Sequence, residues 1–145
     1  MTVVVGLGTT PLAELAIERA VREAKGRGLP LVVVAPVTMP RGESAESEYR
    51  ELRTRTEAEA NRRAAKLAET HSIECTAFVP SIPADLGYAV LRAAEEVEAE
   101  LIVVGVRRRS PVGKAVLGSD SQTILLGANC EVLSVKLPDE AETRR

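Results

Sequence analysis

Aromatic residues are scarce in this chain. Two of its 145 residues are Tyr, one is Phe and none is Trp, so aromatics make up 2% of the sequence. Proteins that bind single-stranded nucleic acid stack the bases on aromatic side chains, and this chain has almost none to offer. Its net charge of −2 at pH 7 gives no overall attraction to nucleic acid or to an anionic membrane. We therefore expect neither nucleic acid nor a membrane as a partner.

Histidine, cysteine and long apolar runs are also in short supply. The single histidine, His71, lies near the end of a predicted helix, which argues against catalytic triads and histidine-bound metals. Cys75 and Cys130 lack C-x-x-C spacing and are expected to be reduced thiols. No apolar run approaches the roughly 20 residues of a membrane-spanning helix. We expect a cytoplasmic protein, and we assign no catalytic residue because no pair of carboxylates indicates acid–base chemistry.

Apolar periodicity predicts strands that alternate with helices. Near-continuous apolar segments of strand type occupy residues 3–5, 31–35, 73–79, 101–104 and 131–137. Helical spacing occupies residues 12–27 and 45–71, and two further helices begin near Pro83 and at Gly118–Ser119. Strands covered on both faces and joined by helices indicate an α/β domain with a doubly wound parallel sheet. We expect one domain over residues 1–137 and a flexible charged tail over residues 138–145.

The loop that follows the fourth predicted strand is rich in glycine and arginine. It begins at Gly105 and ends where the next helix opens at Gly118–Ser119. Free backbone N–H groups and the partial positive charge at a helix start both favour a bound phosphate. In doubly wound sheets, ligands bind beyond the carboxyl ends of the strands. The loops that leave the first strand (residues 6–11) and the fourth (residues 105–114) are therefore expected to meet at a binding site.

This loop carries the spacing of a known family. Gly105 is followed by two residues, a position that is glycine in the family, nine more residues, and then Gly118–Ser119. With the segments 98–105 and 128–133, this order resembles the universal stress proteins over about residues 3–137. The resemblance implies a Rossmann-like (adenine nucleotide α-hydrolase-like) sheet of five parallel strands in the order 3-2-1-4-5. It also implies a cytoplasmic stress-response protein, usually a homodimer, and many members bind ATP in the cleft between strands one and four.

The resemblance yields a set of candidate nucleotide-binding residues. Gly105, Gly118 and Ser119 would present backbone and hydroxyl donors to phosphates, the cations would neutralise charge, and residues after the first two strands would border the base and sugar. ATP, with Mg²⁺, is the implied cofactor, and any hydrolysis would be slow because no positioned general base is visible. The candidate set is Gly8, Thr9, Val34, Pro36, Gly105, Arg108, Arg109, Gly113, Lys114, Gly118, Ser119 and Asp120.

Three positions depart from the family pattern. Arg108 stands where the second motif glycine belongs, and Gly8 or Leu7 stands where ATP-binding members carry an aspartate. Asp120 stands where a small apolar residue is common; it would repel phosphate, satisfy the helix start or, less often, hold magnesium. These departures keep a second hypothesis open: a nucleotide-free dimeric interaction module whose arginine-rich loop binds a protein partner or a simple anion.

Other motifs in the loops each allow a functional and a simpler interpretation. The three arginines at 107–109, together with Lys114, are interpreted as a phosphate clamp rather than as a solvated loop. Ser110, which follows the arginines, matches the recognition pattern of a basophilic kinase. A P-loop is excluded because Arg108 and Ala115 replace its glycine and its Ser/Thr. A dinucleotide fingerprint is excluded because Pro11 replaces its third glycine.

Two surface features complete the sequence interpretation. The helix at residues 45–71 mixes arginine and glutamate, which is typical of a solvated helix with ion pairs, and Asp85 is interpreted as a surface charge. The fifth strand lies at a sheet edge in the implied fold, and an unprotected apolar edge usually pairs with another strand. We therefore expect a two-fold homodimer through residues 131–137, whose apolar members are Val132, Leu133, Val135 and Leu137.

Overall fold

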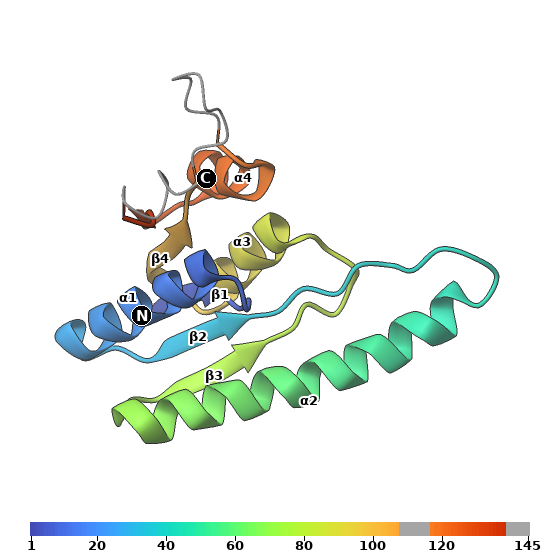
Figure 1. Ribbon diagram of the computed structural model, residues 1–145, viewed down its shortest axis with the longest axis horizontal. Coiled ribbons are helices and arrows are strands. Elements are labelled where there is room, and N and C mark those ends of the chain that lie inside the picture. Colours follow the sequence, from blue (N-terminus) through green and yellow to red (C-terminus); the bar gives the residue numbers. More distant parts are fainter. Residues whose placement is uncertain (108–116, 139–145) are drawn as a thin grey trace.

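The computed structural model describes residues 1–107 and 117–138, and within them strands and helices alternate as predicted (Figure 1). The elements in chain order are β1 (Thr2–Gly6), α1 (Pro11–Arg27), β2 (Leu31–Val34), α2 (Ala45–His71), β3 (Cys75–Phe78), α3 (Leu86–Glu96), β4 (Ala99–Gly105), α4 (Ser119–Gly127) and β5 (Glu131–Val135). All five strands begin and end within two residues of their predicted limits. Residues 139–145 of the predicted tail lie outside the described residues.

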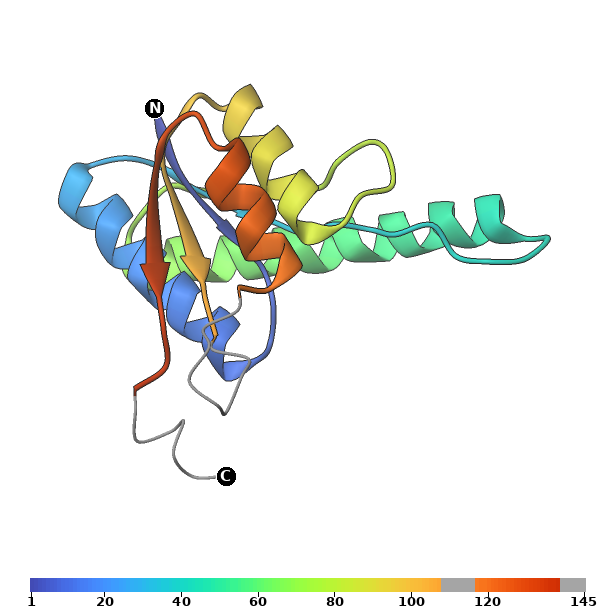
Figure 2. The ribbon, with the colours of Figure 1, turned by 90° about the horizontal axis from the view of Figure 1, so that it is seen from above.

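The sheet has the order β3-β2-β1-β4-β5, and every neighbouring pair is parallel. Successive residues of each strand point to opposite faces, so Val3 and Val5 pack against α1 while Val4 packs against α3 and α4. Helices α1 and α2 cover one face, and α3 and α4 cover the other (Figure 2). This confirms the doubly wound Rossmann-like fold and explains the unbroken apolar runs, because strands buried on both faces need apolar residues throughout.

Helix α1 begins and ends as its sequence predicts. The Thr10 hydroxyl accepts a hydrogen bond from the Ala13 N–H (3.1 Å), and Pro11 occupies the first helical position. The helix stops at Gly28, whose φ of 65° is the left-handed conformation that glycine adopts without strain. The first turn of α1 therefore stands in a fixed position beside the end of β1.

On the other face of the sheet, Asp85 is exposed, as the sequence predicts, and it also has a structural role. Its carboxylate accepts a hydrogen bond from the Tyr88 N–H (2.9 Å) and caps α3. In α4, the leucines do not form the buried face, because Leu117 precedes the helix and both Leu117 and Leu125 are 38% exposed. The buried positions of α4 are Ser121 and Ile124, one turn apart, because the helix begins at Ser119 and presents that narrow stripe to the sheet.

Helix α2 is long and mostly exposed, as predicted, but two of its arginines are not merely solvated. It buries only Tyr49, Ala60 and Ala64, and it runs well past the sheet in Figure 2. Arg53 pairs with Glu57 one turn away (3.3 Å), and its guanidinium also donates to the carbonyls of Val79 and Pro80. Arg63 donates to the carbonyl of Gly8 in the loop after β1 (2.8 Å). These long side chains therefore tie α2 to the loops at the sheet's carboxyl edge.

The edge strand and the cysteines agree with expectation in part. Strand β5 pairs with β4 and ends at Val135, two residues earlier than predicted, with Val132, Leu133 and Val135 half-buried. Cys75 and Cys130 are free thiols. Within residues 1–107 and 117–138, no helix combines the length and apolarity needed to cross a membrane.

A candidate nucleotide cleft between β1 and β4

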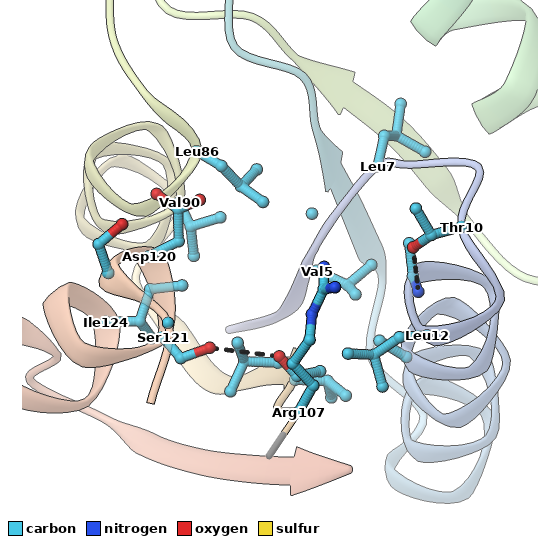
Figure 3. A pocket seen from close by; sticks show the side chains of 18 residues that line it. Val5, Leu7, Thr10, Leu12, Leu86, Val90, Arg107, Asp120, Ser121 and Ile124 are labelled. Carbon is cyan, nitrogen blue, oxygen red and sulfur yellow. Dashed lines mark hydrogen bonds between the residues drawn. The ribbon is translucent and has the colours of Figure 1, made fainter. Parts of the chain in front are cut away.

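A cleft of about 260 Å³ opens at the carboxyl ends of the two central strands, where the sequence places the binding site (Figure 3). Its floor is apolar and consists of residues from both strands, Val5, Val103 and Val104. Polar groups stand around the rim, on the first turn of α1, the end of β4 and the first turn of α4; they are Thr10, Arg107, Ser119, Asp120 and Ser121. An apolar floor with a few polar groups at the rim is the common composition of a small-molecule site.

The two central strands, β1 and β4, each end in a glycine, and a leucine from a neighbouring helix packs against it. A Cβ on Gly105 would lie 2.7 Å from Cγ of Leu12, which comes from α1. A Cβ on Gly6 would lie 2.9 Å from Cδ1 of Leu86, which comes from α3. Both leucines line the cleft, so the two missing side chains let opposite helices close over the strand ends. Gly105 is therefore required here by packing, in addition to any role beside a phosphate.

The first turn of α4 forms one end of the cleft. Gly118 is its N-cap residue, without a side-chain cap, and Ser119 is the first helical residue. The Ser121 hydroxyl donates to the Gly105 carbonyl (3.2 Å), which ties the start of α4 to the end of β4 across the base of the arginine-rich loop. The first turn of α4 thus lines the cleft, and the start of a helix favours a bound anion.

Asp120 lies in this first turn of α4, and its side chain binds the first turn of α3. Its Oδ1 accepts a hydrogen bond from the backbone N–H of Gly87 in the first turn of α3 (3.0 Å). The two helices touch there, because a Cβ on Gly87 would lie 3.2 Å from the Cα of Asp120. The sequence allows several roles for Asp120, and the structure shows one of them, capping of a helix start. The helix that it caps is α3 and not its own helix α4. No group of three His, Cys, Asp or Glu side chains suited to a metal occurs in the described part of the chain.

Among the residues that the structure describes, the cation in the lining of the cleft is Arg107. Its side chain rises from the end of β4 toward Val5 in Figure 3. Arg107 belongs to the predicted arginine clamp but is absent from the candidate set, although the sequence places it only two residues after Gly105. Four members of that set, Arg108, Arg109, Gly113 and Lys114, lie outside the described residues.

The structure brings part of the remaining candidate set together. Gly105, Gly118, Ser119 and Asp120 line the cleft. The other described candidates are not part of its lining: Gly8, Thr9, Val34 and Pro36.

Two of these candidates are engaged in other contacts. The Gly8 carbonyl accepts a hydrogen bond from Arg63, and the carbonyl of the buried Val34 accepts one from the Leu7 N–H (2.8 Å). Leu7 and Thr10 line the cleft instead. Thr10 belongs to the loop 6–11 that the sequence places at the site, but the candidate set does not include it.

Fold and site together define a Rossmann-like domain with a ligand cleft at the switch in strand order. A sequence model of the universal stress protein family matches residues 1–136. A universal stress protein of Mycolicibacterium smegmatis is 31% identical over 142 residues, which cover 92% of this chain and 96% of that protein. The chain belongs to the universal stress protein family.

Solved structures of the family have the same fold. A universal stress protein from Archaeoglobus fulgidus superposes with a TM-score of 0.70 at 28% identity, over 94% of this chain and 98% of that one. A structure of the universal stress protein from Archaeoglobus fulgidus in complex with dAMP gives 0.66 at 25% identity over the same shares. The dAMP complex shows that an adenine nucleotide is a ligand of that relative.

Proposed function

We propose that this protein binds an adenine nucleotide in the cleft between β1 and β4 and acts as a sensor or regulator without fast catalysis. The observation that carries the proposal is the placement of the α4 N-terminus and Arg107 at the mouth of an apolar cleft between the two central strands. The dAMP complex of the Archaeoglobus fulgidus relative supports the same ligand class.

The two ends of the cleft suit the two ends of a nucleotide. The phosphate would lie against the first turn of α4, at Gly118 and Ser119, with Arg107 neutralising its charge. The base and sugar would lie over the apolar floor, between Leu12 and Leu86. Gly8, Thr9, Val34 and Pro36 stay candidates for the outer border of the base, and the four candidates in residues 108–116 for the phosphates.

ATP with Mg²⁺ is the finer form of this proposal. Magnesium usually keeps several waters and takes one or two carboxylates in addition to the phosphates of its nucleotide. The described lining offers a single carboxylate, Asp120, whose Oδ1 already holds the Gly87 N–H. The metal would therefore be held mainly by the nucleotide's own phosphates.

Calorimetric titration with AMP, dAMP and ATP, each with and without Mg²⁺, tests the proposal. Ligand at about 100 times its Kd stabilises a protein by roughly 2.7 kcal/mol, so the melting temperature should rise with nucleotide concentration. Absence of both heat and thermal shift at millimolar nucleotide would overturn it. Mass spectrometry of the small molecule that co-purifies with the protein identifies the natural ligand directly.

A specific observation favours the alternative, a nucleotide-free dimeric module that binds a simple anion or a protein partner. A carboxylate, Asp120, lies at the anion end of the cleft, and Gly8 or Leu7 stands where ATP-binding members of the family carry an aspartate. If this alternative holds, the natural chain binds inorganic phosphate or a protein partner but shows no binding of AMP or ATP. The double substitution Arg108→Gly with Gly8→Asp would then create ATP binding where the natural chain has none.

We also propose a homodimer through the edge strand, in the cytoplasm, in a stress response. In the described sheet β5 is the outermost strand beside β4, and its apolar side chains are only half-buried. A second copy would pair with this edge and cover it. Sedimentation measurements that show a clean monomer at micromolar concentration would contradict the dimer.

A further inference from the structure

Helix α2 supplies no residue to the lining of the cleft, yet it reaches the loop that forms one wall. Arg63, in the second half of α2, donates from Nη1 to the carbonyl of Gly8 (2.8 Å). Its Nη2 lies 3.3 Å from Oε1 of Glu14, in the first turn of α1. One guanidinium therefore holds both the loop after β1 and the helix that follows it.

The loop is held at three further points. The Leu7 N–H donates to the Val34 carbonyl (2.8 Å), and the Thr10 hydroxyl accepts from the Ala13 N–H (3.1 Å). Between them, a Cβ on Gly8 would lie 2.8 Å from that of Ala13, so the loop is pressed against α1. Leu7 and Thr10, on either side of Gly8, line the cleft.

We infer that Arg63 is a positioning residue of the nucleotide cleft, which acts through the Gly8 carbonyl to fix Leu7 and Thr10 in the cleft wall. A guanidinium suits this task because its planar fork serves a carbonyl and a carboxylate at once, with hydrogen bonds strengthened by its charge. The Arg63 side chain is 30% exposed, so it is partly shielded from competing water. The effect on nucleotide affinity rests on the proposed function, whereas the effect on the loop does not.

The chain offers a matched control on the same helix. Arg53 also donates to backbone carbonyls, those of Val79 and Pro80, and also pairs with a glutamate, Glu57. It holds the loop after β3, and neither carbonyl belongs to the cleft lining. Arg63→Met and Arg53→Met therefore remove the same kind of contact at different places.

Amide hydrogen exchange of the nucleotide-free protein is the first measurement. In Arg63→Met, the bonded amides of Leu7, Ala13 and Glu14 should exchange about tenfold faster, because each opens more often when its loop is released. In Arg53→Met these amides should keep their rates, while the Ala84 amide, bonded to Val37 (3.1 Å), exchanges faster. Unchanged exchange at Leu7 and Ala13 in Arg63→Met overturns the inference.

Titration with AMP and dAMP is the second measurement. Arg63→Met should weaken binding about tenfold, the effect of losing one charge-assisted hydrogen bond that orders the site. Arg63→Lys, which keeps the charge but not the fork, should lie between, and Arg53→Met should bind within about twofold of the natural chain. Faster exchange with unchanged affinity in Arg63→Met overturns the positioning role. If the natural chain binds neither nucleotide, the proposed function is overturned. If amide exchange in the loop after β1 still depends on Arg63 in that case, the contact of Arg63 with the loop is supported independently of the function.

Discussion

Oδ1 of Asp120, at the start of α4, holds the backbone N–H of Gly87, at the start of α3, at 3.0 Å. One carboxylate thus joins the first turns of two helices on the same face of the sheet. The same residue lines the cleft, where a negative charge opposes a bound phosphate. Asp120 therefore stabilises the fold through its hydrogen bond to Gly87 but lowers the affinity of the cleft for a phosphate through its charge.

Asp120→Asn should separate these two effects. The amide oxygen of asparagine still accepts the Gly87 N–H, so stability should change little, whereas the lost charge should tighten nucleotide binding by roughly twofold to fivefold. Asp120→Ala removes the hydrogen bond as well and should cost about 1 kcal/mol of unfolding free energy. Urea denaturation and calorimetric titration of both variants measure the two effects. Equal stability of the two variants would show that the bond to Gly87 contributes nothing.

Gly105→Ala should destabilise the protein because the new methyl group meets Leu12. The nearest atom is the branching carbon Cγ, 2.7 Å away, which cannot swing aside as a side-chain end does. Overpacking of this kind costs about 1–3 kcal/mol. In a Leu12→Ala background the same substitution should cost clearly less, and urea denaturation of the four proteins closes the double-mutant cycle. Additive losses would show that the two residues do not compete for space.

Gly118→Ala is the control for this cycle. Gly118 has a φ of −64°, which any residue adopts, and a Cβ there meets no described atom within 4 Å. Its unfolding free energy should stay within about 1 kcal/mol of the natural value, since the change affects only the N-cap position. The family motif therefore contains one glycine required by packing and one that the described structure does not require.

Arg107→Gln should weaken the binding of nucleotides but not of nucleosides. The guanidinium projects into the cleft, so it would contact the phosphate (Figure 3). Loss of a charged hydrogen bond should weaken AMP affinity about tenfold and leave adenosine affinity unchanged. Arg92→Gln, which makes the same charge change on α3 away from the cleft, is the control. An equal loss for AMP and adenosine would place Arg107 away from the phosphate.

The regular features of this protein could be predicted because their signals are local. Valine runs buried on both faces identify the strands, and Thr10–Pro11 and Gly28 mark the ends of α1 without reference to the rest of the chain. The contacts that shape the cleft are not local. Arg63 and Gly8 are 55 positions apart and Asp120 and Gly87 are 33 apart. Only the completed sheet brings these partners together, so Arg63 was interpreted as a solvated charge.

Cys75 should make the stability of the protein fall at alkaline pH. Burial raises the pKa of its thiol from 9.0 to about 11, so between these values the folded state keeps a proton that the unfolded chain has lost. The stabilisation is complete below about pH 9 and is lost as pH rises through about 11. Cys75→Ser has no titrating thiol at this position, so its unfolding free energy should fall less steeply over that range. Parallel slopes in urea denaturation would contradict the raised pKa.

Ser134→Lys should weaken the proposed dimer without unfolding the subunit. Ser134 is exposed on the edge strand β5, so its replacement leaves the core intact. Antiparallel pairing of two copies about a two-fold axis brings each Ser134 close to its counterpart or to the partner's apolar residues. Lysines placed there repel each other or lose hydration, and edge lysines are a common means of preventing strand pairing. Sedimentation equilibrium should show the dimer dissociation constant rising several-fold, with an unchanged melting temperature in dilute, monomeric samples.

Ser47→Lys, on the exposed start of α2, is the matched control and should leave the dimer unchanged. Equal dimerisation of both variants would move the interface away from β5.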